Sequence, residues 1–222
     1  MPYRKTDNVA RKLAARHTAI LAAAREAIAA GGMEAVQIAA VAERAGIATG
    51  TVYRYFPAKT DLVAELVRAL AIEEVAALGG TARAAPGPLS ALAAAFLTFG
   101  VRVLTRRRIA TALLTEPVDA DVAAARAPYR AALAAEFERL IAAALAGGHL
   151  PEQDSRLTAT AILGALIDGL IGLGAPPVTQ DAWSRAHVQA LALLTLRALG
   201  VADARARGLV VQTVLPVIDS LP

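Results

Sequence analysis

Apolar residues recur at helical spacing along most of the chain, and no segment alternates apolar and polar residues as a half-buried strand would. The pattern predicts a first helix from about Asp7, an acceptable N-cap, to the stop at Gly31-Gly32. Residues 1–6 are then expected to form a mobile basic arm. The apolar face of this helix is predicted to consist of Leu13, Ile20, Leu21, Ala24 and Ile28.

Two short helices are predicted next, over residues 37–45 and 49–56. Gly46 supplies the tight turn between them, since glycine adopts positive φ at little cost, and Pro57 ends the second helix. The inward-facing residues are predicted to be Ile38, Val41, Ala42, Ala45, Ile47, Val52, Tyr55 and Phe56, whereas Gly50, Thr51 and Arg54 face outward with Tyr53 on the shoulder.

A longer helix follows from residue 59 or 60 to 78, and Leu62, Leu66, Leu70 and Glu73 follow its periodic face. Residues 79–88 (GGTARAAPGP) form the clearest loop. Further helices are predicted over residues 89–105, 109–114, 122–146, 155–173 and 179–199, with a kink at Pro128 and one more short helix in the tail 202–222. The fold class is therefore all-α, divided into residues 1–58 and a larger domain over 59–222.

The charge distribution adds a partner to this picture. Residues 1–60 carry nine Lys/Arg against four Asp/Glu, a net charge of +5, whereas the remainder carries 14 against 15, or −1. The whole basic excess therefore lies beside the two short helices. Because phosphate neutralisation supplies most non-specific DNA affinity, this excess indicates a polyanion as the partner, and double-stranded DNA is the one expected beside a helix-turn-helix.

Several function classes lack support in the sequence. The chain has no cysteine, which fits a reducing cytoplasm, and it shows no phosphate loop, nucleophile elbow or histidine metal pattern. We therefore expect no catalytic residues, no metal and no cofactor. Residues 157–175 have the length of a membrane span, but Asp168 and the Gly/Pro break after it favour a helix buried from two sides, so no membrane partner is expected.

The outward residues of the second short helix suit a DNA backbone clamp. Thr51 and Tyr53 hydroxyls can donate to phosphates, Lys59 can place a charge on one, and Arg54 can reach a guanine edge or a phosphate. An ordinary helical hairpin with a basic surface, in a small-molecule binder or enzyme, remains the alternative.

The run from Ile38 to Leu62 (IAAVAERAGIATGTVYRYFPAKTDL) closely resembles the signature of the TetR family of transcriptional regulators, and the likeness reaches back to Ile20. It implies a three-helix DNA-binding domain on an all-helical, ligand-binding and dimerising domain, usually in a repressor that a small molecule releases from a palindromic operator. By this resemblance Thr51, Tyr53, Tyr55 and Lys59 contact phosphates, Thr49, Gly50, Tyr53 and Arg54 face bases or the groove, and Gln37 meets the backbone.

Three positions depart from the family pattern. Ala48 and Ala58 stand where a capping serine is frequent, so each helix start loses a cap worth about 1 kcal/mol. Ala39 stands where a base-reading arginine is frequent, so base recognition is expected to depend more on Arg54, Thr49 and the basic arm.

The two helices over 155–173 and 179–199 carry apolar stripes that fit a four-helix bundle across a twofold axis. The resembled family also dimerises here. Core packing within one chain is the alternative, and different faces can do both. The predicted interface residues are Ile162, Gly169, Leu170, Leu173, Leu191 and Leu194.

An effector pocket is predicted where large or polar side chains interrupt the alanine-rich larger domain. Asp168 is expected to be buried and paired, structurally or with a ligand. Arg106-Arg107-Arg108 and the acidic stretch from Glu116 to Asp121 are predicted to be solvated, and no role is assigned to Trp183. The predicted pocket residues are Phe96, Phe99, Arg102, Thr111, Leu114, Tyr129, Leu166 and Asp168.

Overall fold

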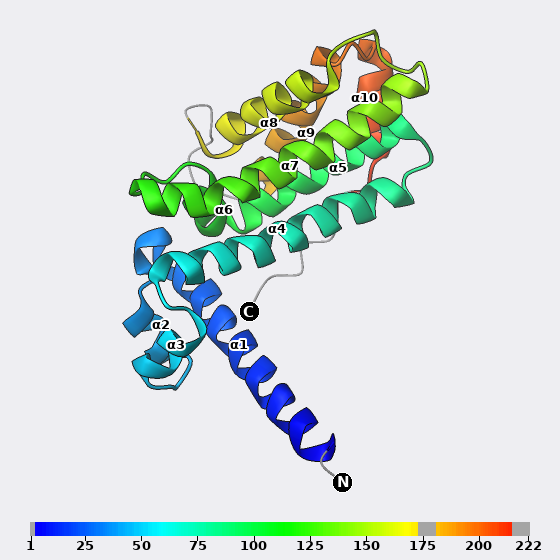
Figure 1. Ribbon diagram of the computed structural model, residues 1–222. Helices are drawn as coiled ribbons and strands as arrows, with labels where there is room; N and C mark the ends of the chain where they lie inside the picture. The colour runs from blue at the N-terminus through cyan, green and yellow to red at the C-terminus, as the bar shows by residue number, and fades with distance from the viewer. Residues whose placement is uncertain (1–2, 173–180, 215–222) are drawn as a thin grey trace.

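The computed structural model describes residues 3–172 and 181–214, and the side chains of 10–172 and 185–214. All regular structure in these ranges is helical, so the predicted all-α fold class is confirmed (Figure 1). Leu173, the side chain of Trp183 and the end of the predicted tail lie outside the described residues. The elements are α1 (Tyr3–Gly31), η1 (Met33–Ala35), α2 (Ile38–Arg44), α3 (Thr49–Tyr55), α4 (Lys59–Ala84), α5 (Pro88–Thr105), α6 (Arg107–Leu114), α7 (Ala120–Ala146), α8 (Ser155–Ile171), α9 (Asp181–Ala198) and α10 (Asp203–Gln212).

The first helix is longer than the sequence pattern predicted. It begins at Tyr3, so residues 3–6 continue the helix and Asp7 is not its N-cap. The N-terminal half of α1 projects beyond α2 and α3, which pack against the other half (Figure 1). Leu13 is therefore 47% exposed, against the prediction that it joins the apolar face, and burial along the described side chains of α1 starts at Ile20.

The helix-turn-helix forms as its turn residue predicts. Gly46 has φ 65°, in the left-handed region that favours glycine, and the Ile47 N–H donates to the Ala42 carbonyl at 3.0 Å. Val52 and Phe56 are buried, so α3 sits on α1 and α2 by one face and leaves the other in solvent. The turn η1, which the sequence analysis did not predict, follows Gly32 at φ 75°.

The loop predicted over residues 79–88 is mostly helix. The α4 helix runs to Ala84, through both glycines, and only a short connection precedes Pro88 at the start of α5. Gly79 is buried, and a Cβ there would lie 3.2 Å from Oε1 of Glu136 on α7. Close packing against α7 thus outweighs the low helix propensity of the glycine pair. Similarly, α7 continues through the exposed Pro128.

The α5 helix lies at the centre of the larger helical layer. It packs against α4, α7, α8 and α9, and its Phe96 and Phe99 rings both meet Phe137 of α7 edge-on, at 5.3 and 5.8 Å between ring centroids. Among the described helices α5 alone is long and apolar enough to cross a membrane, but 72% of that segment is buried inside the fold. Burial of this extent accounts for its composition.

Substitution by alanine is expected to change the free energy of unfolding in opposite directions at two glycines of the larger domain. Gly100→Ala should lower the free energy of unfolding by about 1–3 kcal/mol, because the new Cβ would lie 2.7 Å from Cγ1 of the buried Val188. Gly80→Ala, in a helix with open space at that position, should raise it by about 0.5–1 kcal/mol. Urea denaturation measures both, and a stabilising Gly100→Ala would contradict the close packing of α5 on α9.

Candidate nucleic-acid interface and effector site

The solvent face of α3 gathers most of the predicted DNA contacts on one surface. Thr49, Gly50 and Arg54 are exposed, Tyr53 is 51% exposed, and Thr51 is half-buried at the edge. Lys59 at the start of α4 is half-buried, and Gln37 before α2 is exposed. These side chains share a face because the apolar Val52 and Phe56 fix the opposite face of α3 against the core.

Tyr55 does not belong to this surface. Its hydroxyl is buried and has no hydrogen-bond partner within the described part of the chain, and its ring lies 6.3 Å from that of His17 on α1. One helical turn separates Tyr55 from the buried Val52, so both side chains point inward. The prediction of a phosphate contact by Tyr55 is therefore wrong for this conformation, whereas its prediction as an inward-facing residue is confirmed.

The starts of α3 and α4 lack side-chain caps at Ala48 and Ala58, as predicted. At α4 the loss is partly offset, because the carboxylate of Asp61 accepts a hydrogen bond from the Ala58 N–H at 2.9 Å. At the start of α3 the Thr51 N–H instead donates to the Ala48 carbonyl at 2.8 Å, which is a hydrogen bond between backbone groups. The α3 helix therefore relies on its buried face for its position.

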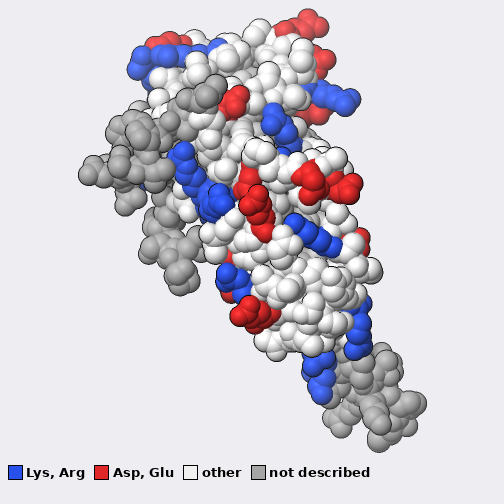
Figure 2. Space-filling view, turned by 90° about the vertical axis from the view of Figure 1, so that its left-hand side faces the viewer, with Lys and Arg blue, Asp and Glu red and all other residues white. Residues whose placement is uncertain are grey.

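The projecting end of α1 is basic. Arg11, Lys12 and Arg16 are exposed along it. Figure 2 shows blue side chains bordering this end of the molecule, while acidic and basic groups alternate higher up on the same face. An extended positive helix beside the exposed face of α3 suits contact with a nucleic-acid backbone.

The larger domain holds the end of α1 through α6. Arg108 Nη2 donates to the Gly31 carbonyl at 2.7 Å, and Oε1 of Glu116 accepts from the Met33 N–H at 3.1 Å. Arg108 and Glu116 were predicted to be solvated. Arg108 is half exposed, as predicted, but Glu116 is not. Both satisfy backbone groups that the end of α1 and the start of η1 leave free, so α6 and the residues just after it hold that end of the DNA-binding domain.

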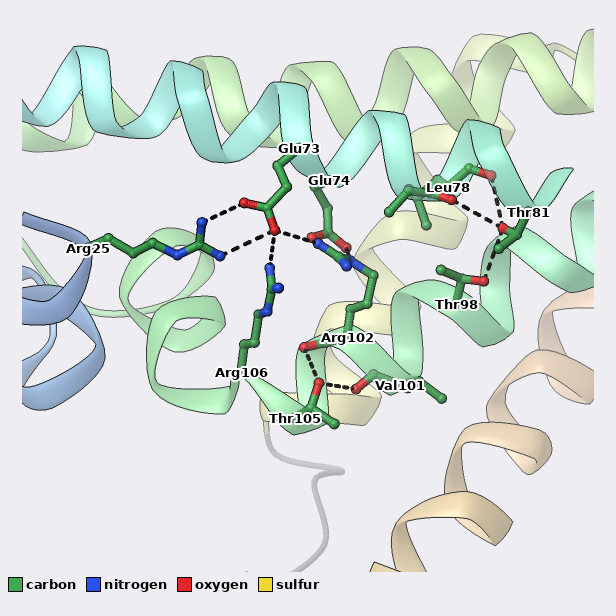
Figure 3. Close-up of polar contacts among 11 residues, drawn as sticks. Arg25, Glu73, Glu74, Leu78, Thr81, Thr98, Val101, Arg102, Thr105 and Arg106 are labelled. Carbon is green, nitrogen blue, oxygen red and sulfur yellow. Dashed lines mark hydrogen bonds and ion pairs between the residues drawn. The ribbon is translucent and has the colours of Figure 1, made fainter. Parts of the chain in front are cut away.

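A second connection centres on the carboxylate of Glu73 in α4 (Figure 3). Arg25 of α1 binds it in bidentate fashion, with Nη1 2.6 Å from Oε2 and Nη2 3.2 Å from Oε1. Arg106, at the corner between α5 and α6, also donates to Oε1. Arg102 of α5 donates from Nη2 to the same oxygen at 3.3 Å and from Nε to Oε1 of Glu74 at 2.8 Å.

Glu73 stays ionised in this setting. Burial raises its pKa, but hydrogen bonds from Arg25 and Arg106 outweigh burial and bring the pKa down to about 2. Burial also raises the pKa of the Tyr129 hydroxyl, and the negative charge of Glu74 adds to this rise, so Tyr129 is a neutral donor. The sequence signal for this cluster was a glutamate, Glu73, on the apolar face of α4. Arg106 was wrongly assigned to a solvated helix end.

A small pocket opens beside these charges. Its cavity volume is about 20 Å³, which is enough for a water molecule but far below the volume of a drug-sized ligand. Its walls come from α4, α5, α6 and α7. The lining residues are Leu70, Glu74, Arg102, Val103, Arg106, Ile109, Ala110, Leu113 and Tyr129.

Of the predicted pocket residues, the structure brings Arg102 and Tyr129 to this pocket. Phe96, Phe99 and Leu166 are instead fully packed in the core, because edge-on stacking and the close fit of α8 consume their surfaces. Thr111 and Leu114 of α6 are half-buried and do not line the pocket. Asp168, predicted to be buried, is exposed on the outer face of α8.

The α8 and α9 helices present a different face to solvent from the one predicted. Ile162 and Leu170 are buried in the subunit's own core, and a Cβ at Gly169 would meet the Leu191 side chain of α9 at 2.5 Å. These four predicted interface residues thus lie inside the subunit, where Gly169 and Leu191 pack α8 onto α9, whereas Leu194 is 55% exposed. The outer face consists of Leu157, Thr160, Ala161, Ala165 and Asp168 on α8 and Ala186, Ala190, Leu194 and Ala198 on α9.

An exposed recognition helix on a glycine-turned hairpin, tied to a larger all-helical domain, defines a helix-turn-helix DNA-binding protein. Residues 20–66 match the profile of the family described as bacterial regulatory proteins, tetR family. This region of the chain therefore has the DNA-binding domain of the TetR family.

The chain is also similar to two repressors over a short stretch. The HTH-type transcriptional repressor KstR of Rhodococcus jostii (strain RHA1) is 65% identical over 43 residues, which cover 19% of this chain and 19% of KstR. The KstR repressor of Mycobacterium tuberculosis is 64% identical over 33 residues, or 15% of each chain. The chain thus aligns with less than a fifth of the length of these relatives.

Solved structures match over the larger domain as well. The RolR complex with the ligand resorcinol superposes with a TM-score of 0.66 at 26% identity, covering 94% of this chain and 99% of RolR. The transcriptional regulator FadR from Bacillus subtilis, in complex with stearoyl-CoA, has a TM-score of 0.66 at 19% identity, covering 79% and 97%. The FadR likeness shows the fold alone.

Removing the charge of Glu73 should lower stability in a pH-dependent way. Because its folded pKa of about 2 lies below the ordinary value of 4.5, the carboxylate stabilises the fold above pH 4.5 and loses this effect as the pH falls towards 2. Allowing for its 35% exposed side chain, Glu73→Gln should cost about 1–2 kcal/mol at pH 7. Urea denaturation of both proteins between pH 7 and pH 3 measures this difference, which should shrink below pH 4.5.

The exposed Glu152 provides the control. Glu152→Gln should leave the free energy of unfolding within about 0.5 kcal/mol of the wild type at each pH. A Glu73→Gln effect that stays constant down to pH 3 would show that the carboxylate contributes no charge-dependent stability.

Proposed function

We propose that this protein is a homodimeric transcriptional repressor that binds a palindromic operator through α3 and leaves it when a small molecule binds the larger domain. The observation that carries the proposal is the exposed face of α3, with Thr49, Gly50, Tyr53 and Arg54, on a TetR-type domain. In this proposal residues 1–58 bind DNA, residues 59–222 bind effector and partner subunit, and the protein acts in the cytoplasm without a catalytic role.

Each exposed residue takes a role from its chemistry. Tyr53, Thr51 and Lys59 hold the phosphate backbone, and Gln37 contacts it from the start of α2. Arg54 reads a base edge, because its guanidinium is exposed at the end of α3 and can donate two parallel hydrogen bonds to guanine. The projecting basic end of α1 adds further backbone contacts.

The outer face of α8 and α9 is the proposed dimer interface. Small side chains such as Ala161, Ala165 and Ala190 allow two helix pairs to approach closely across a twofold axis, with Leu194 and Leu157 covered at the join. A dimer of this kind places two α3 helices in successive major grooves, about 34 Å apart. The resorcinol complex of RolR supports a small-molecule effector for this protein.

The operator is sought by mobility shift and footprinting on the DNA upstream of this gene. A protected inverted repeat whose half-sites lie about one helical turn apart supports the proposal, and binding should weaken steeply as salt rises. Affinity for that DNA no better than for bulk DNA would contradict it. Steep salt dependence also separates this proposal from an enzyme with an incidental basic hairpin.

Substitutions on α3 should separate positioning contacts from base recognition. Tyr53→Phe and Lys59→Ala should weaken binding to all DNA sequences alike, and Lys59→Ala should lower the salt slope by about one. Arg54→Ala should cost about 1–3 kcal/mol on the operator and relax the preference at one base pair. Competition mobility shifts with single-base operator variants measure both effects. Equal loss on every sequence would make Arg54 a phosphate contact.

A charge on the outer face of α8 should break the dimer. Ala165→Arg would place an unpaired guanidinium in the proposed interface, which costs several kcal/mol on burial and shifts the protein to monomer. Light scattering coupled to size exclusion measures the mass. Ala142→Arg, at an exposed alanine of α7, is the matched control and should remain dimeric. A dimeric Ala165→Arg variant would place the interface elsewhere.

A further inference from the structure

The pocket beside α5 and α6 has one charged end and one apolar end. Arg102, Arg106, Glu74 and the neutral Tyr129 hydroxyl form the polar part of its lining. The remaining walls are aliphatic, supplied by Leu70, Val103, Ile109, Ala110 and Leu113. A ligand that fits this division has an apolar body with a single polar group at one end.

The charges at the polar end do not balance. Three arginines, Arg25, Arg102 and Arg106, face two carboxylates, Glu73 and Glu74, which leaves a net charge of +1. Burial of an uncompensated charge is costly, and the guanidinium side chains of Arg102 and Arg106 are only 19% and 22% exposed. A single negative charge in the pocket would neutralise the cluster.

The hydrogen bonds are distributed as unevenly as the charges. Oxygen Oε1 of Glu73 accepts from all three arginines, whereas a carboxylate oxygen has two lone pairs. Arg106 has five N–H donors, and its one side-chain hydrogen bond within the described part of the chain goes to that crowded oxygen. An additional anionic acceptor beside Arg102 and Arg106 would relieve this crowding.

We propose that the effector is a small apolar molecule with one anionic oxygen group, which Arg102 and Arg106 bind in competition with Glu73. The water-sized pocket widens to admit it as the two arginines turn away from Glu73. The proposal rests on the proposed function for its regulatory meaning, but the binding site itself does not depend on DNA. A cation is the weaker fit, because Glu74 is already paired with Arg102 at 2.8 Å and the cluster already carries excess positive charge.

Competition for the two arginines also couples ligand binding in the pocket to the position of the DNA-binding domain. Glu73 binds Arg25 of α1 on one side and Arg102 and Arg106 on the other (Figure 3). An anion that draws Arg106 away frees the corner between α5 and α6 from α4. The α6 helix starts at this corner. It carries Arg108, which holds Gly31, and it leads into Glu116, which holds Met33, so its movement repositions the end of α1.

Four benzene derivatives of similar size and different charge test the ligand class on the full-length protein. Benzoate and benzenesulfonate are monoanions, benzamide is neutral and benzamidine is a cation. Charge-assisted hydrogen bonds should make the two anions bind roughly tenfold or more tightly than benzamide, with benzamidine weakest, as measured by calorimetry at constant ionic strength. A difference between the two anions tells a carboxylate preference from a sulfonate one.

Variants locate the binding. Arg106→Gln should remove the preference for benzoate over benzamide, and Arg106→Lys, which keeps the charge, should retain part of it. Arg139→Gln, at an exposed arginine paired with Glu136 on α7, is the matched control and should bind benzoate as the wild type does. Equal affinity for all four compounds, no binding by any of them, tighter binding of benzamidine, or an unchanged preference in Arg106→Gln would overturn the proposal.

The coupling between anion binding and operator binding is tested separately, on the footprinted operator. Benzoate should lower operator affinity of the wild type and of Arg139→Gln at least about fivefold and leave Arg106→Gln unaffected. If the protein fails to bind any operator while benzoate selectivity holds, the proposed function is wrong and the anion site stands. If operator binding holds while the anion preference is absent, the repressor proposal stands and the anion site is wrong.

Discussion

One carboxylate, that of Glu73 on α4, joins the DNA-binding domain to the larger domain. Arg25 reaches it from α1, and Arg102 and Arg106 reach it from the far end of α5, so one acidic group on α4 ties three helices. Its low pKa of about 2 keeps the tie charged throughout the physiological range. Each partner is an arginine with several N–H donors, so Glu73 can exchange hydrogen bonds among them and stay paired.

The DNA-binding surface depends on this tie because α3 has little rigidity of its own. It is a short helix without side-chain caps at its start, and one buried face fixes it on α1 and α2. The end of α1 is in turn fixed by α6, through Gly31 and Met33. The orientation of α3 is therefore set by the larger domain.

The larger domain shows how an alanine-rich core avoids large cavities. Where helices carry small residues they approach closely, as Gly100 of α5 does at Val188 and Gly169 of α8 does at Leu191. A small pocket lies beside the arginine and glutamate cluster, where long charged side chains separate the helices.

Helical periodicity and turn chemistry are local properties, so they were enough to predict the all-α class, the glycine turn at Gly46 and the exposed residues of α3. The direction of other side chains was set by the tertiary structure. It extended α4 through Gly79, turned the Tyr55 hydroxyl inward, exposed Asp168, and paired Glu73 with arginines 29 to 48 residues away. Periodicity defines a face of a helix but not its neighbour, and the neighbour decides whether a charge is solvated, paired or placed in a pocket.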